Sequence, residues 1–524
     1  MATMDAPPQV LPRSGQASRR ARWLKIAGVV VLGILAALIF VLALKWPFSR
    51  EAMLKRLEHA TSGRVEFGKF SSKYFPPGCV AEDVRLYQQR NQTKLPDGEK
   101  SEPLIRVERL TISTGYAALL RKHIEKIVAE GAVVHIPHGG AELKSSSGKK
   151  NDVTIGDLEA DNSVLELAPE KRGEKPMVFK VRRARFRNVG NGDTSAYDVA
   201  LSVPLPRAEV ESKGWIGPWR DANGDVRSTP ISGEYAVRNL DLGSFDSMMG
   251  MVSSHGEFQG TLAKLNVSGE SESPDFGVKE SGHHFPLSTK FRGTVDLASG
   301  DVELPVLTAK LGSLTLEADA QITGKPKTVQ LNVKRGRGEV QDLMLLFSDK
   351  PKSPIAGPIT FQMRSSLPPE KRPFKQRVQL VGNFDVDPAR FTEDDTEDNV
   401  AKLSAHARGD KKEMDKDEPP PVLSNLRSDV RLANGEAHFT NLSFSVPGAT
   451  ANMEGTYELT DKKVNLQGKM KMQAKLSEAT KGVKSFFLKL LNPFFKKKNA
   501  GAELPVAMTG KYGHTHFSVG LTKK

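Results

Sequence analysis

Residues Ser313–Ile322 read SLTLEADAQI, and apolar and polar residues alternate through this stretch without a break. Leu314, Leu316 and three further apolar residues occupy one set of alternate positions, and only polar or charged residues occupy the other. Successive side chains of a β-strand point to opposite faces, so the pattern predicts a strand with one wet face and one apolar face. The alternation recurs at 329–333 and 378–384. The sequence therefore predicts a mainly β protein.

A few segments have the spacing of short helices instead of strands. The clearest is Glu51–Thr61, in which apolar residues recur at helical spacing before Gly63. Further short helices are predicted at Ala117–Leu120, Leu242–Ser253, Val340–Phe347 and Asn399–Arg408. Two stretches are loops by composition, Lys144–Asp152 and Gly409–Pro421.

The chain also contains an internal repeat. When it is shifted by 135 positions, Arg292–Asn332 lies over Arg427–Gln467 without a gap, and the turn glycines Gly300 and Gly435 coincide. Each copy is a strand, a glycine turn and further strands. Such a unit is suited to stacking side by side.

The stretch Ile26–Leu44, IAGVVVLGILAALIFVLAL, is free of charge and proline and about 28 Å long as a helix, close to the thickness of a hydrocarbon core. Trp23 and Trp46 flank it, where indoles favour the membrane interface. A basic tail precedes it, and no cleavage site or second span follows it. The sequence therefore predicts a single uncleaved anchor, with the tail in the cytoplasm and the remainder across the membrane.

The predicted organisation has five parts. They are a disordered cytoplasmic tail (1–22), a transmembrane anchor helix (23–46), an N-terminal module (47–140), a central β region (141–350) and a C-terminal β region (351–524).

Composition narrows the classes of partner that we expect for the protein. The net charge is +14 and the basic residues are spread along the chain, without an arginine-rich arm or an aromatic RNA-binding signature. An exported basic protein is expected to meet an anionic membrane surface and no nucleic acid. Cys79 is the only cysteine, so no intrachain disulfide can form.

The residues contain no constellation that predicts catalysis, a metal or a cofactor. His135 and His138 have no third ligand nearby, and the same holds for the pairs His283/His284 and His514/His516. Gly336–Gly338 is not followed by the rest of a dinucleotide-binding loop. We therefore predict that the protein is not an enzyme; a polysaccharide-modifying β-solenoid is the minor alternative.

Several stretches resemble one family. Gly63–Leu86 (GRVEFGKFSSKYFPPGCVAEDVRL), Leu104–Ser113 (LIRVERLTIS) and Ile124–Pro137 (IEKIVAEGAVVHIP) resemble the opening module of AsmA-like envelope proteins. Gly435–Met470 resembles the C-terminal region of that family. The resemblance implies that residues 47–140 and 351–524 are AsmA-like regions. The family is similar to the larger TamB-type and YhdP-type proteins.

The resemblance implies an inner-membrane anchor and a periplasmic, elongated, curled antiparallel β-sheet that forms a groove with an apolar floor. It also implies a role in phospholipid transport between envelope membranes and in outer-membrane biogenesis, with no catalytic residue. The residues expected to line the lipid-binding groove are Val295, Leu297, Leu314, Leu316, Val329, Leu331, Val430, Leu432, Phe439, Leu442, Phe444, Val464 and Leu466.

Two alternatives remain open from the sequence. The same apolar residues could close a dry core between two sheets. The protein could also be an envelope scaffold whose partner is an outer-membrane assembly protein, without conducting lipid.

Near the C-terminus, residues 476–492 have apolar residues on one face at helical spacing, and three lysines follow at 496–498. One interpretation is a lid on the end of the sheet. The other is an interfacial helix that binds anionic lipid. With the tryptophans, its residues complete the predicted membrane-interface set of Trp23, Trp46, Phe486, Phe487, Leu490 and Leu491.

Overall fold

The computed structural model describes residues 46–61, 63–88, 103–136, 153–168, 176–190, 194–218, 226–245, 247–370, 372–408, 422–472, 503–511 and 514–519. The predicted tail (1–22), the span Ile26–Leu44, the loops Lys144–Asp152 and Gly409–Pro421, and the helix 476–492 lie outside these residues. Within them, no helix has the length and apolar character that a membrane crossing requires.

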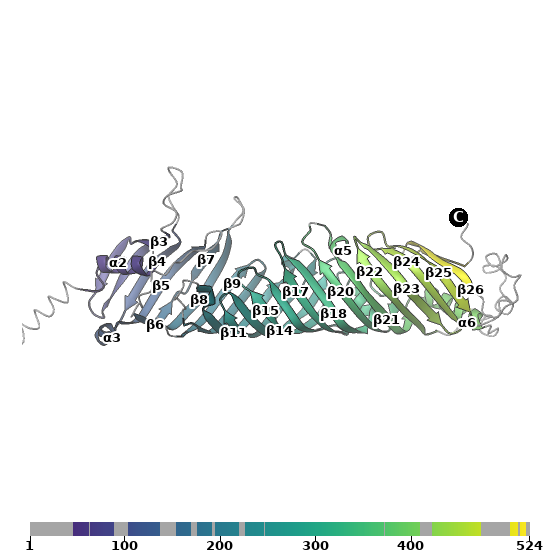
Figure 1. Cartoon of the computed structure of the whole chain (residues 1–524). Helices are drawn as coiled ribbons and strands as arrows, with labels where there is room; N and C mark the ends of the chain where they lie inside the picture. Colours follow the sequence, from purple (N-terminus) through teal and green to yellow (C-terminus); the bar gives the residue numbers. More distant parts are fainter. Residues whose placement is uncertain are drawn as a thin grey trace, which may run out of the picture.

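The described residues form one sheet of 27 strands that curls about a long axis, from the purple N-terminal end to the yellow C-terminal end (Figure 1). Almost every strand pairs antiparallel with the one before it and the one after it along the chain. The fold is thus mainly β and built on a long, curled, largely antiparallel sheet, as the alternation predicts.

We divide the sheet into three sections. The N-terminal section contains β1 (Gly63–Glu66), β2 (Lys69–Lys73), β3 (Gly78–Gln88), β4 (Ile105–Ser113), β5 (His123–Ile136), β6 (Thr154–Glu159), β7 (Ser163–Leu167) and β8 (Met177–Val189). The central section contains β9 (Ser195–Pro204), β10 (Arg207–Ile216), β11 (Pro230–Asp241), β12 (Met248–Met249), β13 (Met251–Thr261) and β14 (Lys264–Val278).

The C-terminal section forms the rest of the sheet. It contains β15 (Phe285–Asp296), β16 (Val302–Leu311), β17 (Leu314–Thr323), β18 (Thr328–Glu339), β19 (Ile355–Ala356), β20 (Pro358–Leu367), β21 (Gln379–Phe391), β22 (Ser424–Ala433), β23 (Glu436–Val446), β24 (Ala449–Glu458), β25 (Lys463–Met472), β26 (Glu503–Lys511) and β27 (His514–Val519).

The antiparallel order has one exception, in the N-terminal section. The short strands β6 and β7 both pair parallel with β5, β6 along its first half and β7 along its last residues. Both then pair antiparallel with β8. Two short strands therefore share one position in the sheet, and the ladder continues through them into β8.

The curl has a local cause. Register shifts recur between neighbouring strands, for example between Val237 and Leu240 on β11 and between Leu304 and Leu307 on β16. A β-bulge bends its strand and increases the local twist. Repeated bulges therefore bend the sheet into a trough.

The helices lie at the ends and edges of the sheet. They are α2 (Arg50–Thr61), α3 (Tyr116–Leu120), α4 (Val340–Leu345), α5 (Phe374–Arg377) and α6 (Asp394–Arg408), with short 3-10 turns at Val226–Ser228 and Leu242–Ser244. Helices α2, α3 and α4 confirm the helices that the sequence predicts at Glu51–Thr61, Ala117–Leu120 and Val340–Phe347. Helix α6 begins five residues before the predicted Asn399, since the acidic residues of its first turn suit the positive end of a helix.

The predicted helix Leu242–Ser253 is wrong. Only Leu242–Ser244 is helical, and β13 begins at Met251. From Val252 to Phe258 the side chains alternate between more and less buried positions, which is the period of a strand. The three methionines at 248, 249 and 251 lie on the strands β12 and β13.

The repeat of 135 residues is a repeat of structure. The bulge between Arg292 and Thr294 on β15 recurs between Arg427 and Asp429 on β22. The bulge between Leu304 and Leu307 on β16 recurs, at the same shift, between Phe439 and Leu442 on β23. The turn glycines have φ values of 71° (Gly300) and 80° (Gly435), a left-handed conformation that favours glycine. Both copies therefore bend the sheet at the same places.

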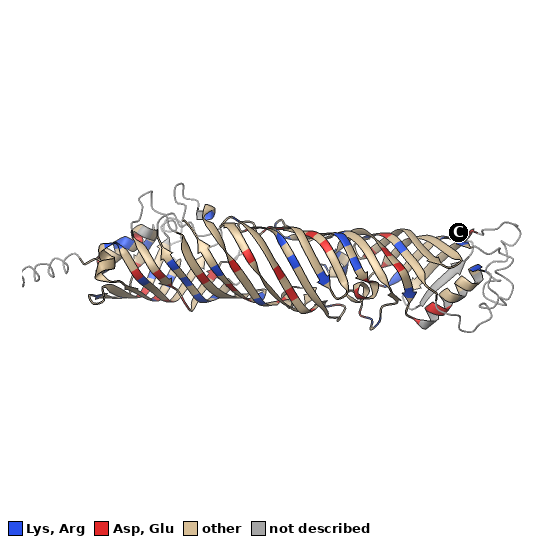
Figure 2. Cartoon of the chain, turned by 90° about the horizontal axis from the view of Figure 1, so that it is seen from below, with Lys and Arg blue, Asp and Glu red and all other residues tan. Residues whose placement is uncertain are grey.

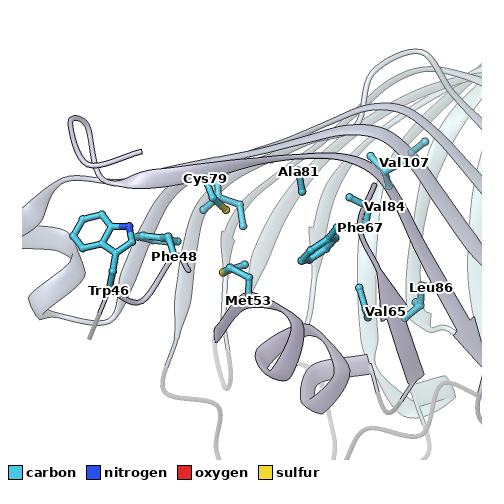
Figure 3. Packing of buried hydrophobic residues seen from close by; sticks show 12 residues of the cluster. Trp46, Phe48, Met53, Val65, Phe67, Cys79, Ala81, Val84, Leu86 and Val107 are labelled. Carbon is cyan, nitrogen blue, oxygen red and sulfur yellow. The ribbon is translucent and has the colours of Figure 1, made fainter. Parts of the chain in front are cut away.

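The two faces of the sheet differ in chemistry. On the concave side, which we call the inner face, helix α2 packs against β1–β4 with apolar side chains between them (Figure 3). Acidic and basic residues are distributed along the whole length of the sheet (Figure 2), and the register places many of them on the outer face. The pair Arg335–Glu317 joins the neighbouring strands β18 and β17 there, and the pair Arg182–Glu209 reaches across β9 from β8 to β10. Since both partners are exposed, each pair adds little stability.

Candidate functional site

The candidate site is the inner face. Residues paired directly across neighbouring strands share a face, so the register defines rows that run along the trough. One row crosses every long strand from β8 to β26. It consists of Ala184, Val199, Ser212, Tyr235, Gly256, Gly269, Phe291, Leu307, Ala318, Val333, Met363, Gly382, Val430, Phe439, Gly455, Leu466 and Met508.

The predicted groove residues, with one exception, lie on this face. Val295 pairs with Val302, which leads through Ile322 to Val329. Leu432 leads in the same way through Ala437 and Tyr457 to Val464. The remaining predicted residues on the inner face are Leu314, Leu316, Leu331, Val430, Phe439, Leu442, Phe444 and Leu466.

Leu297 is the exception. Its side chain is 47% exposed, because β15 ends at Asp296 and Leu297 lies in the following turn. A carboxylate oxygen of Asp296 accepts hydrogen bonds from the backbone N–H groups of Ala298 (2.9 Å) and Ser299 (2.8 Å). An aspartate that bonds to the backbone ahead of it favours a turn over a strand. The placement of Leu297 on the groove floor is therefore wrong.

Short helices cover part of the inner face in the C-terminal section. Near α4, Leu314, Val333 and Val386 are at most 2% exposed and form a cluster with Val340 and Leu346. Around α6, a second cluster includes Leu442, Val464, Leu466, Met470 and Ala407. The hydroxyl of Ser404 on α6 donates a hydrogen bond of 2.7 Å to the backbone oxygen of Pro447, which fixes the helix on the edge of the sheet.

Outside the buried members of these clusters, the apolar inner face stays partly open to solvent. Val295 and Val430 are half-buried, and so are Leu316 and Leu331, which pack against the cluster near α4; Val329 is 39% exposed. A second packed sheet would bury such residues. The exposure favours an uncovered apolar floor here over a dry core between two sheets.

The central section and β15, the first strand of the C-terminal section, carry a polar line on the same inner face. Six hydroxyl side chains from six successive long strands follow one another diagonally, and we call them the hydroxyl track. They are Tyr197 (β9), Ser212 (β10), Tyr235 (β11), Ser254 (β13), Ser271 (β14) and Thr289 (β15).

Hydrogen bonds connect neighbours along the track. The hydroxyls of Tyr197 and Ser212 are 3.2 Å apart, and Ser212 donates to the backbone oxygen of Glu234 at 2.9 Å. Tyr235 is hydrogen-bonded to Ser254, and Ser271 donates to the Ser254 hydroxyl at 2.9 Å. These hydroxyls are therefore satisfied within an otherwise apolar surface.

Paired glycines make room for both tyrosine rings. Gly214 faces Gly233 across β10 and β11, and Gly256 faces Gly269 across β13 and β14. A Cβ on Gly233 would lie 2.3 Å from the Tyr197 hydroxyl, and a Cβ on Gly269 would lie 2.3 Å from the Tyr235 hydroxyl. The hydroxyl end of each tyrosine thus lies over the sheet where glycine leaves the space.

Burial perturbs both phenols. Desolvation raises the pKa of Tyr197, and the hydrogen bond with Ser212 opposes the shift. Desolvation likewise raises the pKa of Tyr235, against the bond with Ser254. Both side chains are neutral at physiological pH and add no charge to the inner face.

Sequence reasoning did not find the hydroxyl track. Each member is an isolated tyrosine, serine or threonine in its own strand, and only the register joins them. One signal was present: Tyr197 and Tyr235 stand at apolar positions of their strands, and glycines follow at matching positions on the next strands.

The described residues hold no group of three or more His, Cys, Asp or Glu side chains arranged to bind a metal. His283 and His284 bond to different backbone oxygens, those of Lys350 (2.9 Å) and Asp275 (3.0 Å). Gly336 and Gly338 lie within β18, and a Cβ on Gly336 would meet the ring of Phe361 at 2.4 Å. Gly336 therefore makes room for an aromatic ring, and both glycines lie in a strand and do not form a nucleotide loop.

Trp46 does not face outward, as a tryptophan that contacts the membrane interface would. Its side chain is 4% exposed, and its ring packs on Phe48 and Tyr74 in the N-terminal core. Trp23, Phe486, Phe487, Leu490 and Leu491, the other predicted interface residues, lie outside the described residues.

Comparisons of the chain with protein-family models, with curated proteins and with solved structures returned no match.

Proposed function

We propose that the protein is an AsmA-like envelope protein, anchored in the inner membrane, that holds phospholipid acyl chains on its inner face during transport between envelope membranes. The observation that carries the proposal is the apolar inner face, which the register makes continuous through the C-terminal section. The stretches at Gly63–Leu86 and Gly435–Met470 that resemble the family support it.

The physical argument concerns the cost of moving an acyl chain through water. Each exposed methylene costs about 0.8 kcal/mol, so a chain of roughly sixteen carbons costs on the order of 12 kcal/mol. If the apolar patches were separate, an acyl chain would be exposed to water between them and would incur that cost. An uninterrupted row such as Val295–Val302–Ile322–Val329, repeated at other levels of the strands, removes it at every step.

The adjacent residues Leu316 and Thr315 allow a matched test. Leu316 is half-buried on the inner face, where it pairs with Ala309 and Gly336. Thr315 points outward between Lys310 and Arg337, whose positive charges suit an aspartate. We expect Leu316→Asp to interrupt lipid passage and Thr315→Asp to leave it intact.

Photo-crosslinking of the full-length protein in its membrane provides the measurement. A photoreactive residue at position 316 should crosslink to phospholipid, and one at 315 should not. Both variants must give the same protease-resistant fragments as the wild type, since a charge on an apolar face can also destabilise the fold. Crosslinks at 315 alone contradict the face assignment, and crosslinks at neither position contradict lipid binding.

The proposed topology has its own test. A reporter that is active only outside the cytoplasm should function when fused after Lys524 and fail when fused before Arg13. The reverse pattern overturns the localisation.

A further inference from the structure

An exposed apolar patch lies at the N-terminal end of the sheet. Tyr74 and Phe75 belong to the turn between β2 and β3, and Tyr116 and Leu120 belong to α3. We call these four residues the end patch. Phe75 and Leu120 are each 89% exposed, whereas the next most exposed large apolar side chain of the described residues, Leu205, is 61% exposed. Two such neighbours need an explanation beyond the ordinary scatter of apolar surface residues.

Contacts to Trp46 fix the place of the patch in the fold. The ring centroid of Trp46 lies 5.0 Å from that of Tyr74 and 6.5 Å from that of Tyr116. The Tyr116 hydroxyl donates a hydrogen bond of 2.6 Å to the backbone oxygen of Tyr74. The backbone N–H of Thr114 donates to the oxygen of Pro77 at 2.9 Å. The turn and the helix therefore form one unit around Trp46.

Sequence position ties this unit to the predicted anchor. The apolar run ends at Leu44, and Lys45 alone separates it from Trp46. The two peptide units from Leu44 to Trp46 span at most about 7 Å, so the end of the span and the unit around Trp46 must lie at a similar depth. Trp46 is buried, so the apolar side chains that face outward at this depth are those of the end patch.

The charge of the two segments matches a phospholipid surface. Residues 69–81 and 114–122 contain neither aspartate nor glutamate. Exposed Lys73 directly precedes the patch in the turn, and exposed Arg121 directly follows it after α3. Apolar side chains flanked by basic ones are typical of segments that lie in the interfacial layer of an anionic bilayer.

We infer that the end patch inserts into the surface of the membrane that holds the anchor, with Phe75 and Leu120 in the acyl boundary and Lys73 and Arg121 at anionic headgroups. The inference rests on the anchor in the proposed function and is independent of lipid transport. It makes the start of the sheet a second membrane contact beside the span, which fixes the tilt of the trough on the bilayer.

Fluorescence quenching of the full-length protein in liposomes tests the inference. Phe75→Cys and Leu120→Cys each supply a labelling site for an environment-sensitive dye. The native Cys79 can stay in place because it is 1% exposed and burial raises the pKa of its thiol to about 11. Leu205→Cys, in the exposed turn between β9 and β10, is the matched control.

Labels at 75 and 120 should be quenched by spin-labelled phospholipid and shielded from iodide in the water, and the label at 205 should show the reverse. Phe75→Asp in the Leu120→Cys protein should weaken the lipid quenching at 120, because the two residues share one contact. The quenching should also fall when anionic lipid is replaced by phosphatidylcholine.

The outcomes separate the inference from the anchor. If the protein floats with the liposomes and labels at 75 and 120 behave like the one at 205, the end patch is free of the bilayer and the inference is wrong. If the protein does not float at all, the anchor fails as well.

Discussion

The central and C-terminal sections of the sheet have the same strand architecture and different inner faces. In both, an aromatic ring lies over inner-face glycine: Tyr235 over Gly256 and Gly269, and Phe361 over Gly336. Tyr235 carries a hydroxyl that bonds to Ser254. Phe361 has no polar atom, and Gly336 beneath it pairs with Leu316.

The difference shows that alternation specifies which face is covered but not how apolar that face is. In the described chain the large buried clusters lie at residues 46–132 and 278–506, on either side of the first five members of the hydroxyl track, Tyr197 to Ser271. The central section replaces large apolar side chains by hydroxyls that bond to one another and by glycines. It therefore gains less stability from burial and more from hydrogen bonds.

The strongest test of this contrast places one charge in each section. Met470 is 2% exposed in the C-terminal core, whereas Ser271 is half-buried beside other hydroxyls. We expect Met470→Asp to lower the free energy of local unfolding by about 3 kcal/mol or more, since the carboxylate has no partner among apolar side chains. We expect Ser271→Asp to lower the free energy of local unfolding clearly less than Met470→Asp does. Hydrogen exchange of β24–β26 and of β13–β14 measures the two effects, and equal losses would contradict the contrast.

A reciprocal exchange of one hydroxyl gives the next effect. Phe361→Tyr adds a hydroxyl over Gly336 in apolar surroundings, and we expect a cost of about 1–3 kcal/mol. Tyr235→Phe removes a hydrogen bond and leaves Ser254 bonded to Ser271 and to the backbone oxygen of Glu270, so its cost should be about 1 kcal/mol. Urea unfolding followed by hydrogen exchange in each section ranks the two. A larger cost for Tyr235→Phe would show that the track is a tightly coupled network.

The smallest effect is expected from pH and appears only under alkaline conditions. Burial holds the pKa of Tyr197 and of Tyr235 above the ordinary value of 10.0. The folded state therefore retains these protons when the unfolded chain has begun to lose them. The resulting destabilisation is absent below pH 10 and grows as the pH rises through the folded-state pKa. Tyr235→Phe should reduce the slope in β11–β14, and an unchanged slope would assign the alkaline loss to other groups.

The parts of this structure that depend on local pattern could be predicted from the sequence. The inner position of Leu314 and Leu316 follows from alternation within a single strand. The prediction that Leu297 lies on the groove floor failed because the Asp296 carboxylate ends β15 a residue earlier than the alternation suggests. The prediction that the Trp46 side chain contacts the membrane interface failed because its packing partners Tyr74 and Tyr116 lie far away in sequence.

The hydroxyl track was beyond local reasoning for a related cause. Tyr197 meets Ser212 only if the register of β9 and β10 is right, and Tyr235 meets Ser254 only if the shift between Val237 and Leu240 on β11 is placed correctly. A shift by one residue would send each hydroxyl to the outer face. Bulges depend on backbone conformations such as the positive φ of Asn239, which the residue type permits but does not require.

The matched bulges of the two copies, 135 residues apart, bear on how such a protein could change size in evolution. Because both copies bend the sheet alike and keep the same residues inward, duplicating the segment inserts new strands without altering the cross-section. Each added strand lengthens the sheet by about 4.8 Å. Length is then an additive, heritable quantity that gene duplication alone can change.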